Sequence, residues 1–174
     1  GRAFGSSMPK WANEIVGGWQ VAGIATWHSG FAFTSVSNAF PISVDNNVPA
    51  IFDGDTKALR TNIHDDDGQI QLFADKNAAM GACRGPIGLE AGSRNNLRGP
   101  SFVNVDLSLN KHFPITERVG LEFRAEAYNA FNHPNFSLPG SGTGSADITD
   151  PTQFGVITTT AAPRQMQMSL RLDF

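Results

Sequence analysis

Two short acidic stretches contain the residues whose type and spacing best suit chemistry, and that chemistry would be calcium binding. They are Asp53-Gly54-Asp55 and Asp65-Asp66-Asp67-Gly68. Carboxylates clustered in a flexible loop offer the hard oxygen ligands that Ca²⁺ prefers. Neither stretch has the spacing of an EF-hand loop, and acidic turns with glycine occur in most long loops. The candidate calcium ligands are therefore Asp53, Asp55, Asp65 and Asp67, and no other cofactor is expected.

The remaining reactive side chains are scattered. The four histidines (His28, His64, His112 and His133) lack the spacing of zinc ligands. Cys83 is the single cysteine, so no internal disulfide can form. No nucleophile motif marks a Ser-His-Asp or Cys-His arrangement. We therefore expect that the protein is not an enzyme.

Composition narrows the class of protein. The 174 residues include 13 Lys and Arg against 16 Asp and Glu, a net charge of −3 without a basic patch, which excludes nucleic acid as an expected partner. The 18 glycines, 10 prolines and 13 phenylalanines suit an all-β chain rich in turns. No run of ~18 apolar residues predicts a transmembrane helix. The first residues lack an initiator Met and a signal peptide, so we expect the C-terminal portion of a longer product.

Four segments alternate apolar and polar residues, and this alternation predicts β-strands at about 15–29, 102–113, 119–131 and 164–174. Each strand would have one apolar and one polar face. Their lengths of ~10–14 residues exceed the five or six usual in soluble sheets and reach the ~9–11 residues that a tilted strand needs to cross a bilayer. The sequence therefore predicts an antiparallel all-β fold whose strands form part of a membrane wall.

The two faces of these strands predict two environments. Lipid contact is expected for the apolar rows Val103, Val105, Leu107, Leu109, Leu121, Phe123, Met166, Met168, Leu170 and Leu172. A water-filled lumen is expected to be lined by Asp106, Glu122, Arg124, Glu126 and Arg171. Charges in a dry core are costly unless they are paired, whereas opposite charges on neighbouring strands of a wet face can pair across the strands. A solvated face of a soluble sheet remains the alternative.

The connections between the predicted strands are of unequal length. Residues 114–118 form a tight turn, whereas long loops are expected at about 30–100 and 132–162. Short turns on one side and long loops on the other are typical of outer-membrane barrels, with the long loops on the cell surface. Trp19 and Trp27 lie on one face at a separation of about 20 Å, close to that of the two aromatic belts of such barrels.

Several motifs occur in order along the chain and resemble those of one family. They are Arg94-Asn95-Asn96-Leu97-Arg98-Gly99-Pro100, Asn104-Val105-Asp106-Leu107-Ser108-Leu109, Pro114-Ile115-Thr116-Glu117-Arg118, Phe123-Arg124-Ala125-Glu126-Ala127-Tyr128-Asn129-Ala130-Phe131-Asn132-His133-Pro134-Asn135-Phe136, Phe154-Gly155-Val156-Ile157 and Pro163-Arg164-Gln165-Met166-Gln167. The chain resembles the C-terminal barrel region of TonB-dependent, Oar-like (carboxypeptidase-regulatory-like) outer-membrane receptors. The resemblance covers nearly the whole chain and is weakest between Ser35 and Leu72.

This resemblance implies a barrel of about 22 strands with an N-terminal plug, in the outer membrane of a Gram-negative bacterium. Such a receptor, driven by TonB, takes up or exports a bulky ligand. Four strands cannot close that barrel, so the expected partners are outer-membrane lipid and the rest of the barrel and plug, from the same or another chain. TonB would be contacted only through a missing N-terminal part. The alternating end of the chain resembles the signal read by the barrel-assembly machinery, which implies that role for Met168, Leu170, Leu172 and Phe174.

A second hypothesis belongs to a different class of protein. The same strands could form a soluble or surface-assembled β-sheet module for binding or adhesion that self-associates through its edges. In that case the apolar rows would be buried against a second sheet or another copy of the chain.

Overall fold

The computed structural model describes residue 9 and residues 15–38, 48–139 and 146–174, and its fold is all-β. The chain divides into two compact units. The first comprises residues 1–26, 103–133 and 162–174, and the second comprises residues 27–102 and 134–161. None of the described helices is long and apolar enough to cross a membrane.

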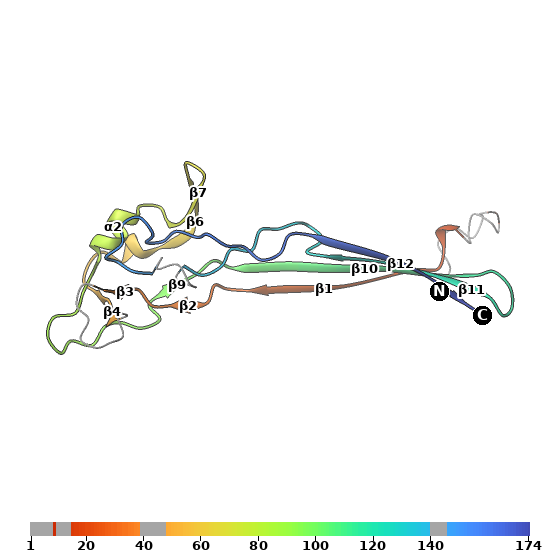
Figure 1. Cartoon of the computed structure of the whole chain (residues 1–174), viewed down its shortest axis with the longest axis horizontal. Helices are drawn as coiled ribbons and strands as arrows, with labels where there is room; N and C mark the ends of the chain where they lie inside the picture. The colour runs from red at the N-terminus through yellow and green to blue at the C-terminus, as the bar shows by residue number, and fades with distance from the viewer. Residues whose placement is uncertain (1–8, 10–14, 39–47, 140–145) are drawn as a thin grey trace. The chain divides into compact units, whose positions relative to one another are not determined.

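The first unit is built on one sheet of four long strands. The strands are β1 (Trp19–His28), β10 (Phe102–Pro114), β11 (Gly120–Tyr128) and β12 (Gln165–Asp173). They lie side by side in the order β1-β10-β11-β12 (Figure 1), and the last three form an antiparallel meander. β1, β11 and β12 fall within segments whose alternation predicts them, and β10 extends one residue beyond its predicted segment.

The pairing register places apolar residues opposite apolar residues. Along β10 and β11, Leu107 faces Ala127 and Leu109 faces Ala125. Along β11 and β12, Phe123 faces Leu170. Since a slip by one residue would turn every side chain of a strand to the other face, this register keeps the two faces of the sheet chemically distinct.

Two strand boundaries differ from the sequence-based prediction. The first strand begins at Trp19 rather than near residue 15, directly after Gly18, whose φ of +74° breaks the extended backbone. The third ends at Tyr128 rather than residue 131, because Asn129 and Asn132 adopt φ values of 50° and 53°. Asparagine tolerates this left-handed conformation better than most residues, so the two residues end the strand in a turn.

The second unit comprises most of the residues predicted as long loops, 30–100 and 132–162, and it contains short secondary-structure elements. Its elements are β2 (Ala32–Phe33), β3 (Val36–Ser37), β4 (Val48–Pro49), β5 (Ile51–Phe52), η1 (Thr56–Leu59), β6 (Thr61–Asp66), β7 (Gln69–Phe73), α2 (Lys76–Gly81), β8 (Cys83–Arg84) and β9 (Leu97–Arg98). The strands pair as β2-β9, β3-β4, β5-β8 and β6-β7. Most of these strands have only two residues, too few to produce an alternating pattern that a sequence reader can recognise.

The second unit has a hydrophobic core to which both of its chain segments contribute. Its buried members are Phe33, Leu72, Phe73, Ala79, Leu97, Phe154 and Ile157. Backbone hydrogen bonds from Leu72 to Gly155 and from Ile157 to Ile70, each 2.9 Å long, join the two segments directly. The rings of Phe73 and Phe154 stack with centroids 5.2 Å apart. The two segments therefore fold as one body.

Candidate functional site

The apolar face of the four-stranded sheet is uncovered among the described residues. On β12, the solvent-exposed fractions of Met168, Leu170 and Leu172 are 68%, 69% and 55%, and Leu107 on β10 is 39% exposed. Neighbouring rows on β10 and β11 are only half-buried. A sealed two-layer sandwich would bury these side chains completely. An exposed apolar surface of this extent is expected to contact a membrane or another protein surface, which removes it from water.

An aromatic cluster closes this face at the end that carries the short turn. The Trp19 ring meets Phe113 and Phe123 edge to face, with centroids 6.3 and 5.9 Å apart. Lys111 lies beside them, with its Nζ 5.0 Å from the Trp19 ring centre and 4.6 Å from that of Phe113. The Lys111 Nζ also donates a hydrogen bond of 2.7 Å to the carbonyl oxygen of Ile15.

Lys111 was not among the predicted site residues, although its position between Leu109 and Phe113 places it in the apolar row. The residue is only 3% exposed. A buried ammonium is stable when hydrogen bonds and cation–π contacts replace the water around it. The carbonyl of Ile15 and the two rings meet that requirement.

The polar face carries the residues that the sequence predicts for a lumen, and their contacts differ from the expectation in one respect. The expected ion pairs would run between neighbouring strands. The observed pairs run along single strands instead: Arg124 Nε lies 2.9 Å from Glu126, and Arg171 Nε lies 2.8 Å from Asp173. Residues two apart on a strand point to the same face, so these pairs satisfy each other locally. Glu122 stands directly opposite Arg171 in the β11–β12 register.

On the polar face, Gln167 of β12 and Tyr128 of β11 both hydrogen-bond to Glu126 of β11. Gln167 Nε2 donates to Glu126, and the Tyr128 hydroxyl donates to the same carboxylate over 3.3 Å. Both hydrogen bonds end on Oε2 of Glu126, whose Oε1 pairs with Arg124. The face is a connected polar surface with exposed charges, which suits contact with water.

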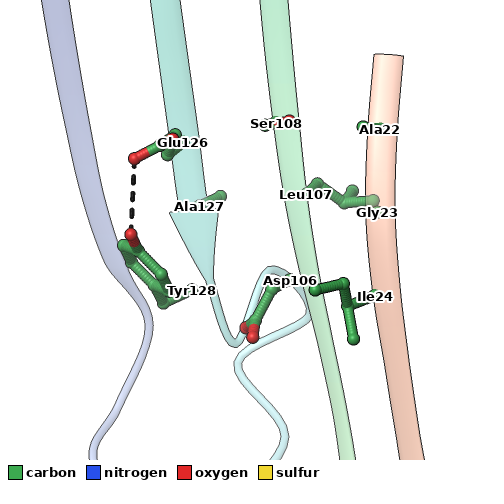
Figure 2. A pocket seen from close by; sticks show the side chains of 9 residues that line it. All are labelled: Ala22, Gly23, Ile24, Asp106, Leu107, Ser108, Glu126, Ala127 and Tyr128. Carbon is green, nitrogen blue, oxygen red and sulfur yellow. Dashed lines mark hydrogen bonds between the residues drawn. The ribbon is translucent and has the colours of Figure 1, made fainter.

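A shallow hollow of about 250 Å³ lies over β1, β10 and β11. Figure 2 shows Asp106, Glu126 and Tyr128 around it, together with the small side chains of Ala22 and Ala127. The Asp106 carboxylate accepts hydrogen bonds from Asn104 Nδ2 and from the backbone N–H of Asn129, each 2.9 Å long. Because Asp106 and Glu126 already have intramolecular partners, the hollow has no charged group reserved for a ligand.

The two outer strands leave the sheet open. β1 and β12 form its edges, and among the described residues neither has a strand on its outer side. The terminal residue Phe174 is 97% exposed. Met168, Leu170, Leu172 and Phe174, which the resemblance implies as an assembly signal, are thus accessible on an edge strand. An open edge is available for pairing with another strand.

The candidate calcium ligands lie in the second unit, and the structure gives three of them local contacts. The Asp55 carboxylate caps η1 by accepting from Lys57 N, and Asp65 accepts from Gly68 N in the β6–β7 turn, over 2.9 and 2.8 Å. Asp53 lies 2.8 Å from Arg84, while Asp67 has φ 49° in the turn. The described part of the chain contains no group of three or more acidic, histidine or cysteine side chains that could hold a metal ion. Calcium binding therefore stays a prediction, and no ligand cluster among the described residues supports it.

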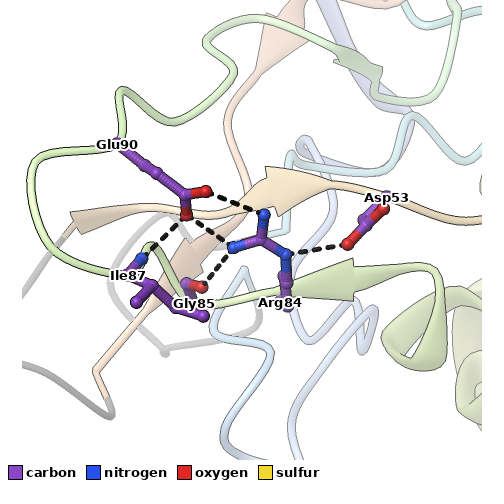
Figure 3. Close-up of polar contacts among 5 residues, drawn as sticks. All are labelled: Asp53, Arg84, Gly85, Ile87 and Glu90. Atoms are coloured by element: carbon purple, nitrogen blue, oxygen red, sulfur yellow. Dashed lines mark hydrogen bonds and ion pairs between the residues drawn. The ribbon is translucent and has the colours of Figure 1, made fainter.

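The strongest charged contact of the second unit is one that the sequence did not indicate. Figure 3 shows Arg84 between Glu90 and Asp53: its Nη1 lies 2.6 Å from Glu90 Oε2, and its Nε lies 2.8 Å from Asp53 Oδ2. Glu90 also accepts from the backbone N–H of Ile87, 2.8 Å away. Hydrogen bonds from Arg84, and then that from Ile87, lower the pKa of Glu90 from 4.5 to about 2. The same carboxylates raise the pKa of the Arg84 guanidinium. This cluster fixes the 85–90 turn and has no open coordination position.

Comparison with known proteins identifies one family. A family model described as "Outer membrane beta barrel domain" matches residues 1–167. Searches of curated proteins and of solved structures found no significant match. The matched range includes β1, β10, β11 and the whole second unit, so the family description applies to almost the entire chain.

Proposed function

We propose that this chain, which belongs to the outer membrane beta barrel domain family, supplies the C-terminal wall strands and surface loops of a TonB-dependent, Oar-like receptor. The receptor would lie in the outer membrane of a Gram-negative bacterium. The observation that carries the proposal is the sheet itself: one face is apolar, the other is charged, and the side chains of both are exposed on β12 and mostly half-buried on β11. Hydrocarbon on the first face and water on the second would satisfy both.

The open edges of β1 and β12 support a wall that continues on both sides. In hydrocarbon each unpaired backbone N–H or C=O group costs several kcal/mol, so a membrane sheet has to be closed into a barrel. The strands that close it come from the rest of the receptor. Asp106, Glu122, Arg124, Glu126 and Arg171 then line the lumen.

The second unit would stand on the cell surface as the part that meets a ligand. Its own core and the Arg84–Glu90 contact give it a defined shape, which favours recognition because little ordering is needed on binding. Uptake or export of a bulky ligand, coupled to TonB, is the transport part of the proposal. Co-purification of TonB with the full-length product tests that part separately, and its absence would remove the TonB assignment but keep the barrel.

The membrane part is tested by labelling paired cysteines in isolated outer membranes, with Cys83→Ser as the background. Leu170→Cys lies on the apolar face, and Ser169→Cys, its neighbour on β12, lies on the polar face. We expect Ser169→Cys to react with a water-soluble maleimide. We expect Leu170→Cys to resist it, and to react with a membrane-soluble reagent.

The rival function, a soluble or surface-assembled adhesive module, gives different results in the same experiment. The protein would then stay in the aqueous fraction without detergent and would show no change of gel mobility on heating. Equal labelling of Leu170→Cys and Ser169→Cys by the water-soluble reagent would overturn the wall proposal. Loss of Leu170→Cys labelling only at high protein concentration would favour self-association.

A further inference from the structure

Lys111 is the single charged residue in the apolar rows of the described sheet. The rows on β11 and β12 contain leucine, phenylalanine, alanine and methionine, and the row on β10 is interrupted once, opposite Phe123. Lysine is almost never fully buried unless its charge is compensated. Its position therefore calls for a physical reason beyond packing.

The compensation comes from an arrangement that involves the start of β1. The carbonyl oxygen of Ile15 accepts from Lys111 Nζ over 2.7 Å and from the Trp19 indole Nε1 over 3.0 Å. The Lys111 Nζ also lies over the Trp19 ring, 5.0 Å from the centre of the ring. Ile15 precedes β1 and Trp19 begins it, so these two contacts of Lys111, unlike the one with Phe113 on β10, depend on the alignment of β1 with β10.

The alignment of β1 with β10 is antiparallel. Trp19 at the start of β1 contacts Phe113 near the end of β10, while His28 at the end of β1 stacks on Phe102 at the start of β10. Between them, a Cβ on Gly23 would lie 2.9 Å from the side chain of Leu107. Gly23 therefore lies beside Leu107. Two residues back along β1 and two residues forward along β10, Val21 lies opposite Leu109.

Alternation alone does not fix this alignment. A slip by one residue is excluded because it exchanges the two faces, but a slip by two residues keeps every apolar side chain on the apolar face. The middle of β1 is especially permissive, since Ala22, Gly23 and Ala25 are small and interlock weakly with a neighbour. Something else has to exclude the slipped pairings.

We infer that Lys111 is a register-determining residue, which selects one pairing of β1 with β10 because its ammonium loses its contacts with Ile15 and Trp19 in the pairings shifted by two residues. In a shifted pairing the ammonium moves away from the Ile15 carbonyl and the Trp19 ring, into an apolar surface that we propose faces lipid. A single polar residue in an apolar seam specifies register in coiled coils by the same physics. The inference rests on the proposed lipid contact of this face.

Oxidative cross-linking of cysteine pairs reads the register directly. The experiment uses the full-length product in outer membranes, again with Cys83→Ser. The native pair is Val21→Cys with Leu109→Cys, and the pairs for slips in the two directions are Val21→Cys with Leu107→Cys and Ala25→Cys with Leu107→Cys. Each pair is compared with Lys111 intact, with Lys111→Met, which has similar length without charge, and with Lys111→Arg, which keeps the charge.

With Lys111 intact we expect only the native pair to cross-link. In Lys111→Met the ratio of shifted to native product should rise about fivefold or more, as follows from losing one cation–π contact and one charge-assisted hydrogen bond that favour the native pairing. Lys111→Arg should keep the native ratio. An unchanged ratio in Lys111→Met overturns the inference.

Two further outcomes are also decisive. If Lys111→Met lowers the amount of folded barrel without producing shifted cross-links, Lys111 contributes to stability only and the register role is wrong. If the protein is found outside the membrane, the proposed function fails on extraction behaviour, whatever the cross-link ratio is. The two failures are therefore distinguishable.

Discussion

The carboxylate of Asp106 accepts a hydrogen bond from the backbone N–H of Asn129, 2.9 Å away, and this contact ties the end of β11 to β10. A backbone hydrogen bond from Ala130 N to Val105 O, 2.8 Å long, lies beside it. The Asn129 side chain continues the connection by donating to the carbonyl of His133 and accepting from its N–H. A residue that the sequence assigns to the lumen thus also shapes the turn that ends the strand.

Removing the acceptor at position 106 should destabilise this turn. In Asp106→Ala the half-buried N–H of Asn129 loses its partner, a loss worth about 1–3 kcal/mol. We expect a lower temperature of heat-modifiable unfolding on gels. Asp106→Asn keeps an acceptor oxygen at the same place and is the matched control, which should stay closer to the unsubstituted protein. Equal losses in both variants would show that charge, rather than the hydrogen bond, matters.

The backbone of Asn129 provides a second prediction. Its φ of 50° costs a residue with a β-carbon roughly 1–2 kcal/mol, whereas glycine adopts it freely. Both Asn129→Ala and Asn129→Gly lose the hydrogen bonds to His133, so their difference in unfolding temperature isolates the backbone term. Asn129→Gly should be the more stable of the two. If Asn129→Ala were as stable, the left-handed conformation would not limit this turn.

Arginine placed on the two faces of β12 should have opposite consequences. Leu170→Arg puts a charge on the apolar face, where a membrane wall loses about 2–4 kcal/mol at mid-depth. Ser169→Arg puts the same group on the polar face one residue away and should have little effect. The measurement is urea unfolding of the refolded full-length barrel in vesicles. Similar losses for both would contradict lipid on the Leu170 side.

Acid should loosen the turn held by Arg84 and Glu90. The pKa of Glu90 in the folded protein is lowered from 4.5 to about 2, so its contribution to stability is complete above pH 4.5. It is lost as the pH falls through about 2. Arg84→Ala should return the pKa of Glu90 towards its usual value, as NMR titration of the carboxyl carbon would measure. In Glu90→Gln, limited proteolysis of residues 85–90 should no longer change between pH 4.5 and pH 2.

The four long strands could be predicted because each has two faces in different surroundings. Alternation in 164–174 and 102–113 is strong enough to place β12 and β10 within a few residues of their observed bounds. The ends were harder, since turns depend on single residues such as Gly18 and Asn129, whose positive φ overrides the strand pattern. Local backbone preference decided those boundaries.

The second unit and the details of the site could not be predicted in the same way. Two-residue strands such as β5 and β8 form because segments that are distant in the sequence pair with each other. Alternation patterns report only on residues that are near one another in the sequence. Glu90 and Asp53 meet Arg84 through that pairing. For Lys111, the sequence shows a lysine at a position of the apolar row. Its contacts with Ile15 and Trp19 depend on the fold and could not be predicted.

The joint core of the second unit has a consequence for engineering and for evolution. Leu72 and Phe154 come from the two different segments of the second unit, 27–102 and 134–161, and share one hydrophobic core. If one segment alone is exchanged between related proteins, the core contacts of the other segment are lost. Chimeras and epitope grafts should therefore transfer both segments together. During natural diversification, a change in the core residues of one segment is expected to be accompanied by a compensating change in the other.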